Sequence, residues 1–123
     1  MLNSQNAAYG QDATQKNYAY FSIEPQIVTN FLSPSVRKVG FVTVSIELML
    51  EDAKYLEEAE HHSPLLRSAL IEVFGQQTEE KVRSLTGRED IRRHCLDQLR
   101  KLMRRETGSD MVKDVIFTKY LYH

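Results

Sequence analysis

The chain of 123 residues carries 16 Lys and Arg against 17 Asp and Glu, so its formal net charge is −1. A chain of this length is typical of a single domain, and an apolar fraction of 41% with 27% charged residues is ordinary for a soluble globular protein. The near-neutral balance creates no global field that would attract nucleic acid or acidic lipid. One cysteine, Cys95, excludes an intramolecular disulfide and with it the class of small disulfide-rich secreted domains.

Hydropathy indicates neither a membrane span nor a signal peptide. No run approaches the ~18 apolar residues of a spanning helix, and Met1 leads into polar residues. We therefore expect either a cytoplasmic protein or a soluble piece of a longer one. Residues 3–19 are polar, rich in Asn and Gln, and show no sustained period. We interpret residues 1–19 as a linker or flexible lead-in, and we expect the ordered domain to span residues 20–123.

Two segments after the lead-in alternate with the period of two that is typical of β-strands. In the first, residues 20–31, Pro25 cannot donate a ladder hydrogen bond, so this strand should lie at a sheet edge or bend there. A turn is predicted at Ser33–Ser35. In the second segment, residues 40–50, we expect one face to be buried under helices. The apolar side chains of that face are Val42, Val44, Ile46, Leu48 and Leu50.

The middle of the chain, up to about Arg105, has the period of helices. A short acidic helix comes first, and Ser63 followed by Pro64 predicts the next helix start, with the serine as its cap. A further short helix precedes the segment TGRE, in which Thr86 and Glu89 predict a capping box for the longest helix. That helix is expected to turn one apolar stripe toward the core, formed by Ile91, Cys95, Leu96, Leu99, Leu102 and Met103.

The chain closes on DVIFTKYLYH, a predicted strand that is apolar on both faces. Strict alternation assigns Phe117 and Leu121 to one face and Tyr120 and Tyr122 to the other. We therefore expect this strand inside the sheet or under a neighbouring subunit, with Lys119 near the rim. The whole pattern predicts an α+β domain: a small, mainly antiparallel sheet of about three strands with three to four helices packed on it.

The sequence contains few groups that could perform chemistry. His61 and His62 hint at a metal site, but neighbouring side chains on a helix diverge and zinc needs three or four ligands. Cys95 falls in the apolar stripe, where a thiol is inert. No phosphate loop, nucleophile elbow or dinucleotide fingerprint is present. We predict no catalytic residue, metal or cofactor, and interpret the protein as a non-enzyme. An enzyme with a cryptic site is the alternative, which a pocket with convergent polar groups would support.

Charge is segregated along the chain. The basic residues of RRHCLDQLRKLMRR lie opposite the apolar stripe without stacking aromatics, so we predict a solvated helix face and no nucleic-acid partner. The acidic stretch 47–60 and the basic stretch 88–105 are either two wet surfaces, or they associate head to tail between copies and close a ring. The candidate interface residues are Glu51, Glu57, Glu58, Arg100, Lys101, Arg104, Tyr120 and Tyr122.

Taken in order, several segments resemble the flagellar basal-body-associated FliL family. They are IEPQIVTNF, KVGFVTVSIELML, SPLLRSALIEVF, SLTGREDIRRHCLDQLRKLM and VIFTKYLYH, and together they cover about residues 20–123. None of them is catalytic. The resemblance therefore implies a family without identifying a site.

The FliL resemblance implies a bacterial inner-membrane protein with one N-terminal span and a periplasmic domain of stomatin-like (SPFH) fold. Such a domain would form homo-oligomers and associate with the MotA/MotB-type stator at the flagellar basal body. It would support motility and chemotaxis by sustaining motor function under load. This chain departs from the family pattern because it lacks the anchor, so we expect a soluble fragment. The alternative is a general stomatin-like membrane-associated scaffold that is not specific to flagella.

Overall fold

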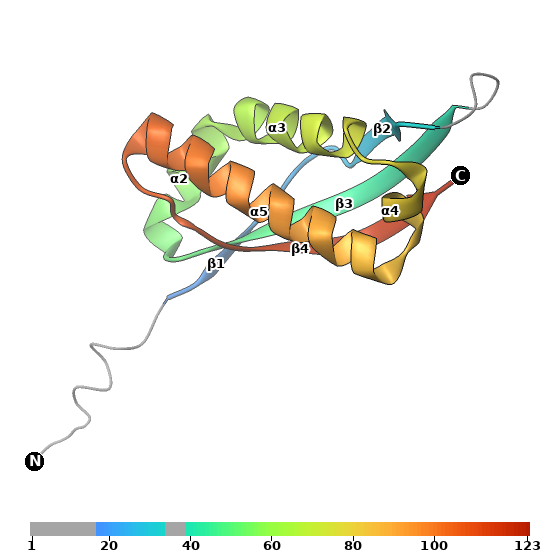
Figure 1. Ribbon diagram of the computed structural model, residues 1–123. Helices are drawn as coiled ribbons and strands as arrows, with labels where there is room; N and C mark the ends of the chain where they lie inside the picture. Colours follow the sequence, from blue (N-terminus) through green and yellow to red (C-terminus); the bar gives the residue numbers. More distant parts are fainter. Residues whose placement is uncertain (1–16, 34–38) are drawn as a thin grey trace, which may run out of the picture.

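A computed structural model describes residues 17–33 and 39–123. Most of the predicted lead-in (1–19) and most of the predicted turn at 33–35 lie outside the described residues. The fold is α+β, as predicted, with four strands in one open antiparallel sheet and the helices stacked above it (Figure 1). In chain order the elements are β1 (Ala19–Ser22), β2 (Ile27–Phe31), β3 (Gly40–Leu50), the 3₁₀ turn η1 (Ala53–Tyr55), α2 (Leu56–His61), α3 (Ser63–Gly75), α4 (Glu79–Arg83), α5 (Leu85–Thr107) and β4 (Val112–Tyr122).

β3 is the central strand of the sheet. β1 and β2 pair with the two halves of one edge of β3, and β4 pairs with its other edge. The predicted first strand is broken at Pro25, between β1 and β2, where the Glu24–Pro25 peptide bond is cis. The amide of Ile23 still donates to the carbonyl of Ile46 across the break. The expectation of a bent edge strand at Pro25 is confirmed, and the break raises the strand count to four.

The predicted position of the terminal strand inside the sheet is wrong, because β4 is an edge strand with β3 as its partner. β3 is central instead, since β1 and β2 together occupy its whole opposite edge. The predicted faces of β4 are wrong as well. Ile46 pairs with Phe117 but Ser45 pairs with Lys119, so Thr118 is an extra, bulged residue. A bulge reverses the alternation that follows it, which places Tyr120 on the same helix-covered face as Phe117.

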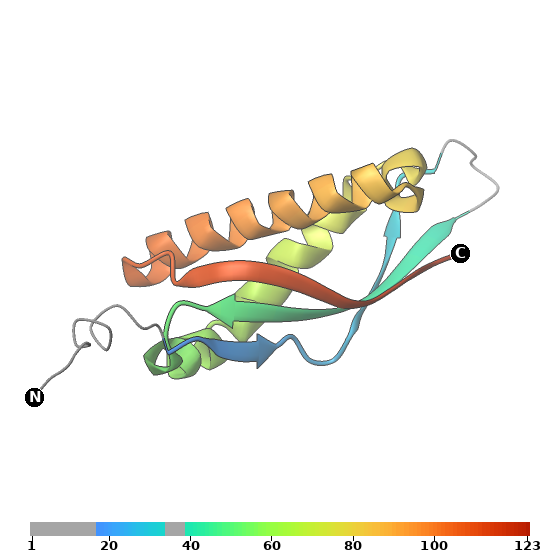
Figure 2. The ribbon, with the colours of Figure 1, turned by 90° about the horizontal axis from the view of Figure 1, so that it is seen from below.

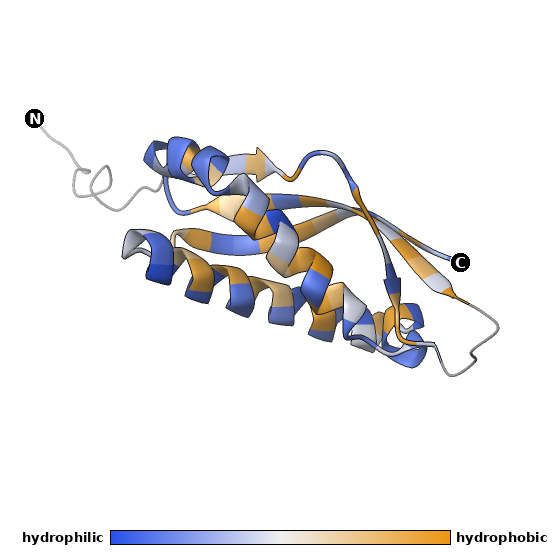
Figure 3. Cartoon of the chain, turned by 90° about the horizontal axis from the view of Figure 1, so that it is seen from above, coloured by the Kyte–Doolittle hydropathy of each residue, from blue (hydrophilic) through white to orange (hydrophobic). Residues whose placement is uncertain are grey.

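The core lies between the sheet and the helices α3 and α5. Val42, Val44 and the other predicted apolar residues of β3 are buried, and Figure 3 shows hydrophobic and hydrophilic residues alternating around α5. The α5 stripe is confirmed: Ile91, Cys95, Leu99 and Met103 are buried, with Leu96 and Leu102 packed against them. In α2 the buried residue is Ala59, whereas the apolar side chain of Leu56 is exposed.

Both predicted serine and threonine caps shift by a residue or two. α5 begins at Leu85 because the Ser84 hydroxyl accepts a 3.0 Å hydrogen bond from the amide of Gly87, so the capping box predicted at Thr86 is wrong. Ser63 is already inside α3, whose cap position is His62. Gly87 packs so tightly against α4 that a Cβ there would lie 2.2 Å from the carbonyl oxygen of Lys81. The first turn of α5 is therefore fixed by a backbone-to-backbone contact.

Candidate interaction surfaces

The predicted basic residues of α5 are partly held by carboxylates of their own chain. Arg100 and Arg104 both donate to Asp110 Oδ2, at 3.0 and 2.7 Å, and Lys101 Nζ lies 3.2 Å from Asp97 Oδ2. Hydrogen bonds from Arg104 and then Arg100 hold the pKa of Asp110 below its ordinary value. Asp110 follows the left-handed Gly108, which ends α5 and turns the chain back along it. Of the three predicted cations, Lys101 is thus held most weakly within the chain, because its ion pair with Asp97 is exposed and lies within one helix.

The predicted acidic residues lie at the end of β3 and on α2. Glu57 is exposed, and Glu58 lies 3.6 Å from His62 Nδ1. Glu51 is half-buried, and its amide donates to the carbonyl of Met111. Among the described residues no ion pair joins Glu57 or Glu58 to the basic residues of α5. The structure of a single chain therefore leaves open which surface the acidic residues meet.

Tyr120 and Tyr122 occupy a corner formed by β4, α4 and the start of α5. The Tyr120 hydroxyl donates a 2.7 Å hydrogen bond to the Val82 carbonyl, and the Arg88 guanidinium lies 4.6 Å from the Tyr120 ring centre. Burial raises the pKa of Tyr120 to about 12. The exposed Tyr122 has the Arg83 guanidinium 5.1 Å above its ring. The Tyr120 side chain is consequently engaged in contacts within its own chain, while the Tyr122–Arg83 cation–π pair lies at the surface.

An ion-pair cluster that the sequence did not reveal ties α5 to β4. Arg92 donates to Glu89 at 2.7 and 2.9 Å, to Asp114 at 2.5 Å and to the Val115 carbonyl at 3.3 Å. The hydrogen bond from Arg92 is the main reason that the pKa of Glu89 falls to about 2. Glu89 and Arg92 are recognisable from sequence as a helical pair, but Asp114 joins them only through the fold.

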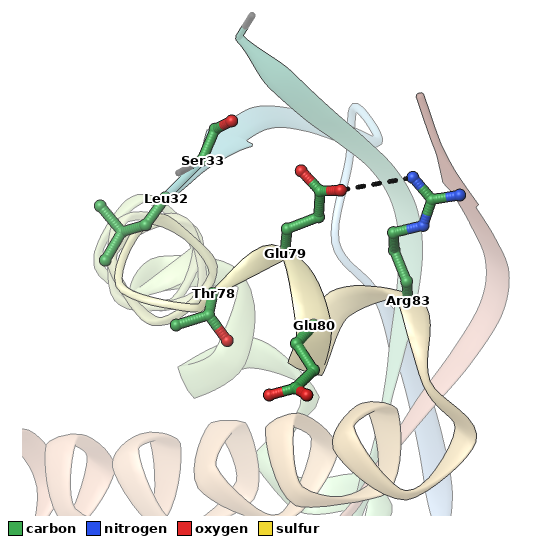
Figure 4. A pocket seen from close by; sticks show the side chains of 6 residues that line it. All are labelled: Leu32, Ser33, Thr78, Glu79, Glu80 and Arg83. Atoms are coloured by element: carbon green, nitrogen blue, oxygen red, sulfur yellow. Dashed lines mark ion pairs between the residues drawn. The ribbon is translucent and has the colours of Figure 1, made fainter. Parts of the chain in front are cut away.

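A hollow of about 480 Å³ lies where β2 approaches α4 (Figure 4). Figure 4 shows Glu79 and Arg83 facing each other, with Glu80 pointing away from them. Arg83 Nη1 lies 3.5 Å from Glu79 Oε2. Leu32, Ser33 and Thr78 complete the lining. This lining contains neither a histidine nor a cysteine, and its one Arg is already paired with Glu79.

Metal-binding and thiol chemistry find little support in the described residues. They include no group of three or more His, Cys, Asp or Glu that could hold a metal ion. The rings of His61 and His62 contact each other edge to face, with centroids 4.9 Å apart. Cys95 is fully buried, as predicted, and burial raises the pKa of its thiol to about 12.

The fold is that of a small two-layer α+β domain. In the part of the chain that the structure describes, its distinctive features are charged and apolar surfaces. The family model described as "Flagellar basal body-associated protein FliL" matches residues 20–122. The chain belongs to this family of flagellar accessory proteins, which is not a known enzyme family, so the resemblance drawn from the sequence is confirmed.

A curated relative is consistent with this family. The chain is 25% identical over 101 residues to a flagellar protein FliL of Aquifex aeolicus (strain VF5), in a match that covers 82% of the chain. The match covers 59% of the relative, so this chain spans less than two thirds of its length. Within the described part of the chain, no helix is both long and apolar enough to cross a membrane.

Proposed function

We propose that the chain is the periplasmic domain of a single-span inner-membrane protein that associates with the MotA/MotB-type stator and supports flagellar rotation under load. The observation that carries this proposal is the match across residues 20–122 to the FliL family, which is described as flagellar basal body-associated. The relative is longer than this chain, which leaves room for an anchor outside the matched part. The function is mechanical and associative, with no catalytic step.

Self-association is part of the proposed function, because a structure that surrounds or braces a stator needs many copies. The proposed similarity to the SPFH fold supports this self-association, because proteins with that fold form oligomers at membranes. The candidate interface remains the acidic and basic sets with the two tyrosines: Glu51, Glu57, Glu58, Arg100, Lys101, Arg104, Tyr120 and Tyr122. Contact between different surfaces of successive copies closes a ring when the rotation between them allows it.

Deleting the gene and measuring swimming in media of increasing viscosity tests the proposal. The account predicts normal flagella whose rotation fails as the load rises, with recovery when the gene is restored. A general membrane scaffold would instead leave motility unchanged at every viscosity. Non-motile cells without flagella would place the protein in flagellar assembly rather than in motor output.

A further inference from the structure

One face of the sheet carries no helix. α3 and α5 pack over Val42 and Val44, whereas Figure 2 views the strands from the other side with no helix in front of them. The register places Val28 and Leu121 on either side of Thr43, so they form one row across β2, β3 and β4. Both are more than half exposed. The large exposed apolar side chains of this open face are Tyr20, Val28, Phe41 and Leu121. Such a surface is typical of an interaction site.

Two opposite charges on the open face have no ion-pair partner in the described part of the chain. Lys119 Nζ lies 3.3 Å from the amide oxygen of Gln26, and Glu47 accepts only a long 3.5 Å contact from the Ser22 hydroxyl. The arginines of α5 differ from them, because most already hold carboxylates of their own chain. Unpaired charges beside an apolar row fix the orientation in which a partner can dock.

The helical side of the same molecule offers a hollow of about 600 Å³ between α3 and α5. Glu72 lies at this hollow and has no ion pair among the described residues. Lys101 is paired there only with the exposed Asp97, and a surface pair of this kind exchanges at little cost. The lining includes Leu65, Ser68, Glu72, Gln98, Lys101 and Leu102. Arg105, which is paired with Glu106, also lines the hollow. The hollow therefore combines apolar walls with one acidic group and two basic groups.

The charges on the two surfaces follow a complementary order along the molecule. Figure 1 shows α5 running from α4 back toward α2. By the bounds of the helices, Lys101 lies in the second half of α5 and Glu72 lies near the C-terminal end of α3. On the open face, Glu47 lies in the second half of β3, and Lys119 pairs with Ser45 at the middle of the same strand. In a second copy held in the same orientation, this order would set Glu47 toward Lys101 and Lys119 toward Glu72. A copy turned end for end would instead set Glu47 toward Glu72 and Lys119 toward Lys101, so that like charges face each other.

We propose that the open face of the sheet docks onto the α3–α5 hollow of a second copy held in the same orientation. The inference rests on the proposed self-association and assigns it surfaces: the open face, rather than the acidic residues of α2, meets Lys101. Because the two surfaces differ, every copy can bind one neighbour on each side and the contact repeats. β1 then begins on the same side in every copy, as chains anchored in one membrane require.

Cysteine cross-linking in cells tests this arrangement directly, because the buried Cys95 leaves little background reactivity. Leu121→Cys reports on the open face, and Ser68→Cys reports on the hollow. The full-length protein with both substitutions should give a ladder of multimers with a membrane-permeant bismaleimide, and each single variant should give none. The matched control combines Leu121→Cys with Leu85→Cys, an exposed position at the start of α5 and outside the hollow. This control should give no ladder.

The other outcomes separate the inference from the function on which it rests. Cross-linked dimers of Leu121→Cys alone would show that two open faces meet, which overturns the inference. No ladder from the double variant, in cells whose native gels show an oligomer, overturns the inference and leaves the proposed function standing. Absence of any oligomer in native gels overturns both the inference and the proposed self-association.

A charge swap supplies an independent readout on the cross-linking background. Glu47→Lys should remove most of the ladder, and adding Lys101→Glu should restore it, because the swapped pair regains opposite charges. The control Lys81→Glu, on α4 and outside the hollow, should restore nothing. An unchanged ladder in Glu47→Lys would contradict the proposed pairing.

Discussion

The hydroxyl of Tyr120 donates a 2.7 Å hydrogen bond to the carbonyl oxygen of Val82, joining the last strand to the short helix α4 across 38 positions of sequence. The same ring packs against Phe74 and Phe117, with ring centroids 6.3 and 5.7 Å away. Tyr120 thereby closes the end of the domain at which α4, α5 and β4 meet. One residue near the C-terminus thus contributes both an apolar contact and a polar anchor to the fold.

Tyr120→Phe keeps the ring and removes the hydrogen bond, so it should lower the free energy of unfolding by about 1 kcal/mol. The shift would be measured by urea denaturation followed by circular dichroism. Tyr122→Phe is the matched control, because no described hydrogen bond involves the Tyr122 hydroxyl. Equal effects of the two substitutions would show that the contact with Val82 contributes nothing specific.

Deleting Tyr120–His123 should destabilise the domain by far more than Tyr120→Phe. The truncation removes the Tyr120 ring and both backbone hydrogen bonds between His123 and Phe41, at 2.8 and 3.0 Å. It also strips the end of β3 of its partner on that edge. Thermal unfolding of the truncated and complete chains checks this expectation. An unchanged melting temperature would show that β4 is not needed to close the sheet.

Asp110→Asn should make the free energy of unfolding less dependent on pH in the acidic range. Because the two arginines lower the pKa of Asp110 in the folded state, the carboxylate stabilises the fold above the ordinary pKa of about 4. That contribution is lost as the pH falls through the folded-state pKa. The urea midpoints of wild type and variant should therefore differ near pH 6 and converge toward pH 2. Asp90→Asn, an exposed aspartate without an ion pair in the described part, is the control. A gap that stays constant with pH would contradict this role of Asp110.

Gly87→Ala should destabilise the domain by about 1–3 kcal/mol, although alanine is the better helix former. The added methyl would lie 2.2 Å from the Lys81 carbonyl, so α4 and α5 must move apart. Gly75→Ala is the control, since a Cβ there would meet its nearest atom at 4.0 Å. Chemical denaturation of both variants compares them. A stabilised Gly87→Ala variant would show that the two helices separate freely.

Sequence patterns predicted the parts of this fold that depend on local periodicity. The buried face of β3 and the α5 stripe follow directly from residue spacing, and the interruption at Pro25 follows from the hydrogen-bond donor that proline lacks. The bulge at Thr118 could not be predicted, because no glycine or proline marks it and strict alternation assigns the wrong face to Tyr120. The spacing of Tyr120 and Tyr122 nevertheless predicted correctly that both side chains lie on the same face of β4.

The charged surfaces were the part of the candidate site that the sequence described least well. Arg100 and Arg104 look free when only α5 is considered, and Asp110 reaches them because Gly108 turns the chain back. The choice of Ser84 over Thr86 as the cap is a similar case, since both residue types cap helices and packing against α4 decides between them. Long-range contacts determine which charges remain available to a partner.

The central claim is association with the stator, and it is tested most directly by co-purification from cells. The full-length protein, tagged and expressed from its own gene, would be captured after mild cross-linking and probed for the stator's B subunit. The account predicts that the B subunit is retained and that it is lost when its plug-and-linker segment is removed. Capture without the B subunit, in cells whose swimming is unaffected by deletion of the gene, would contradict the account.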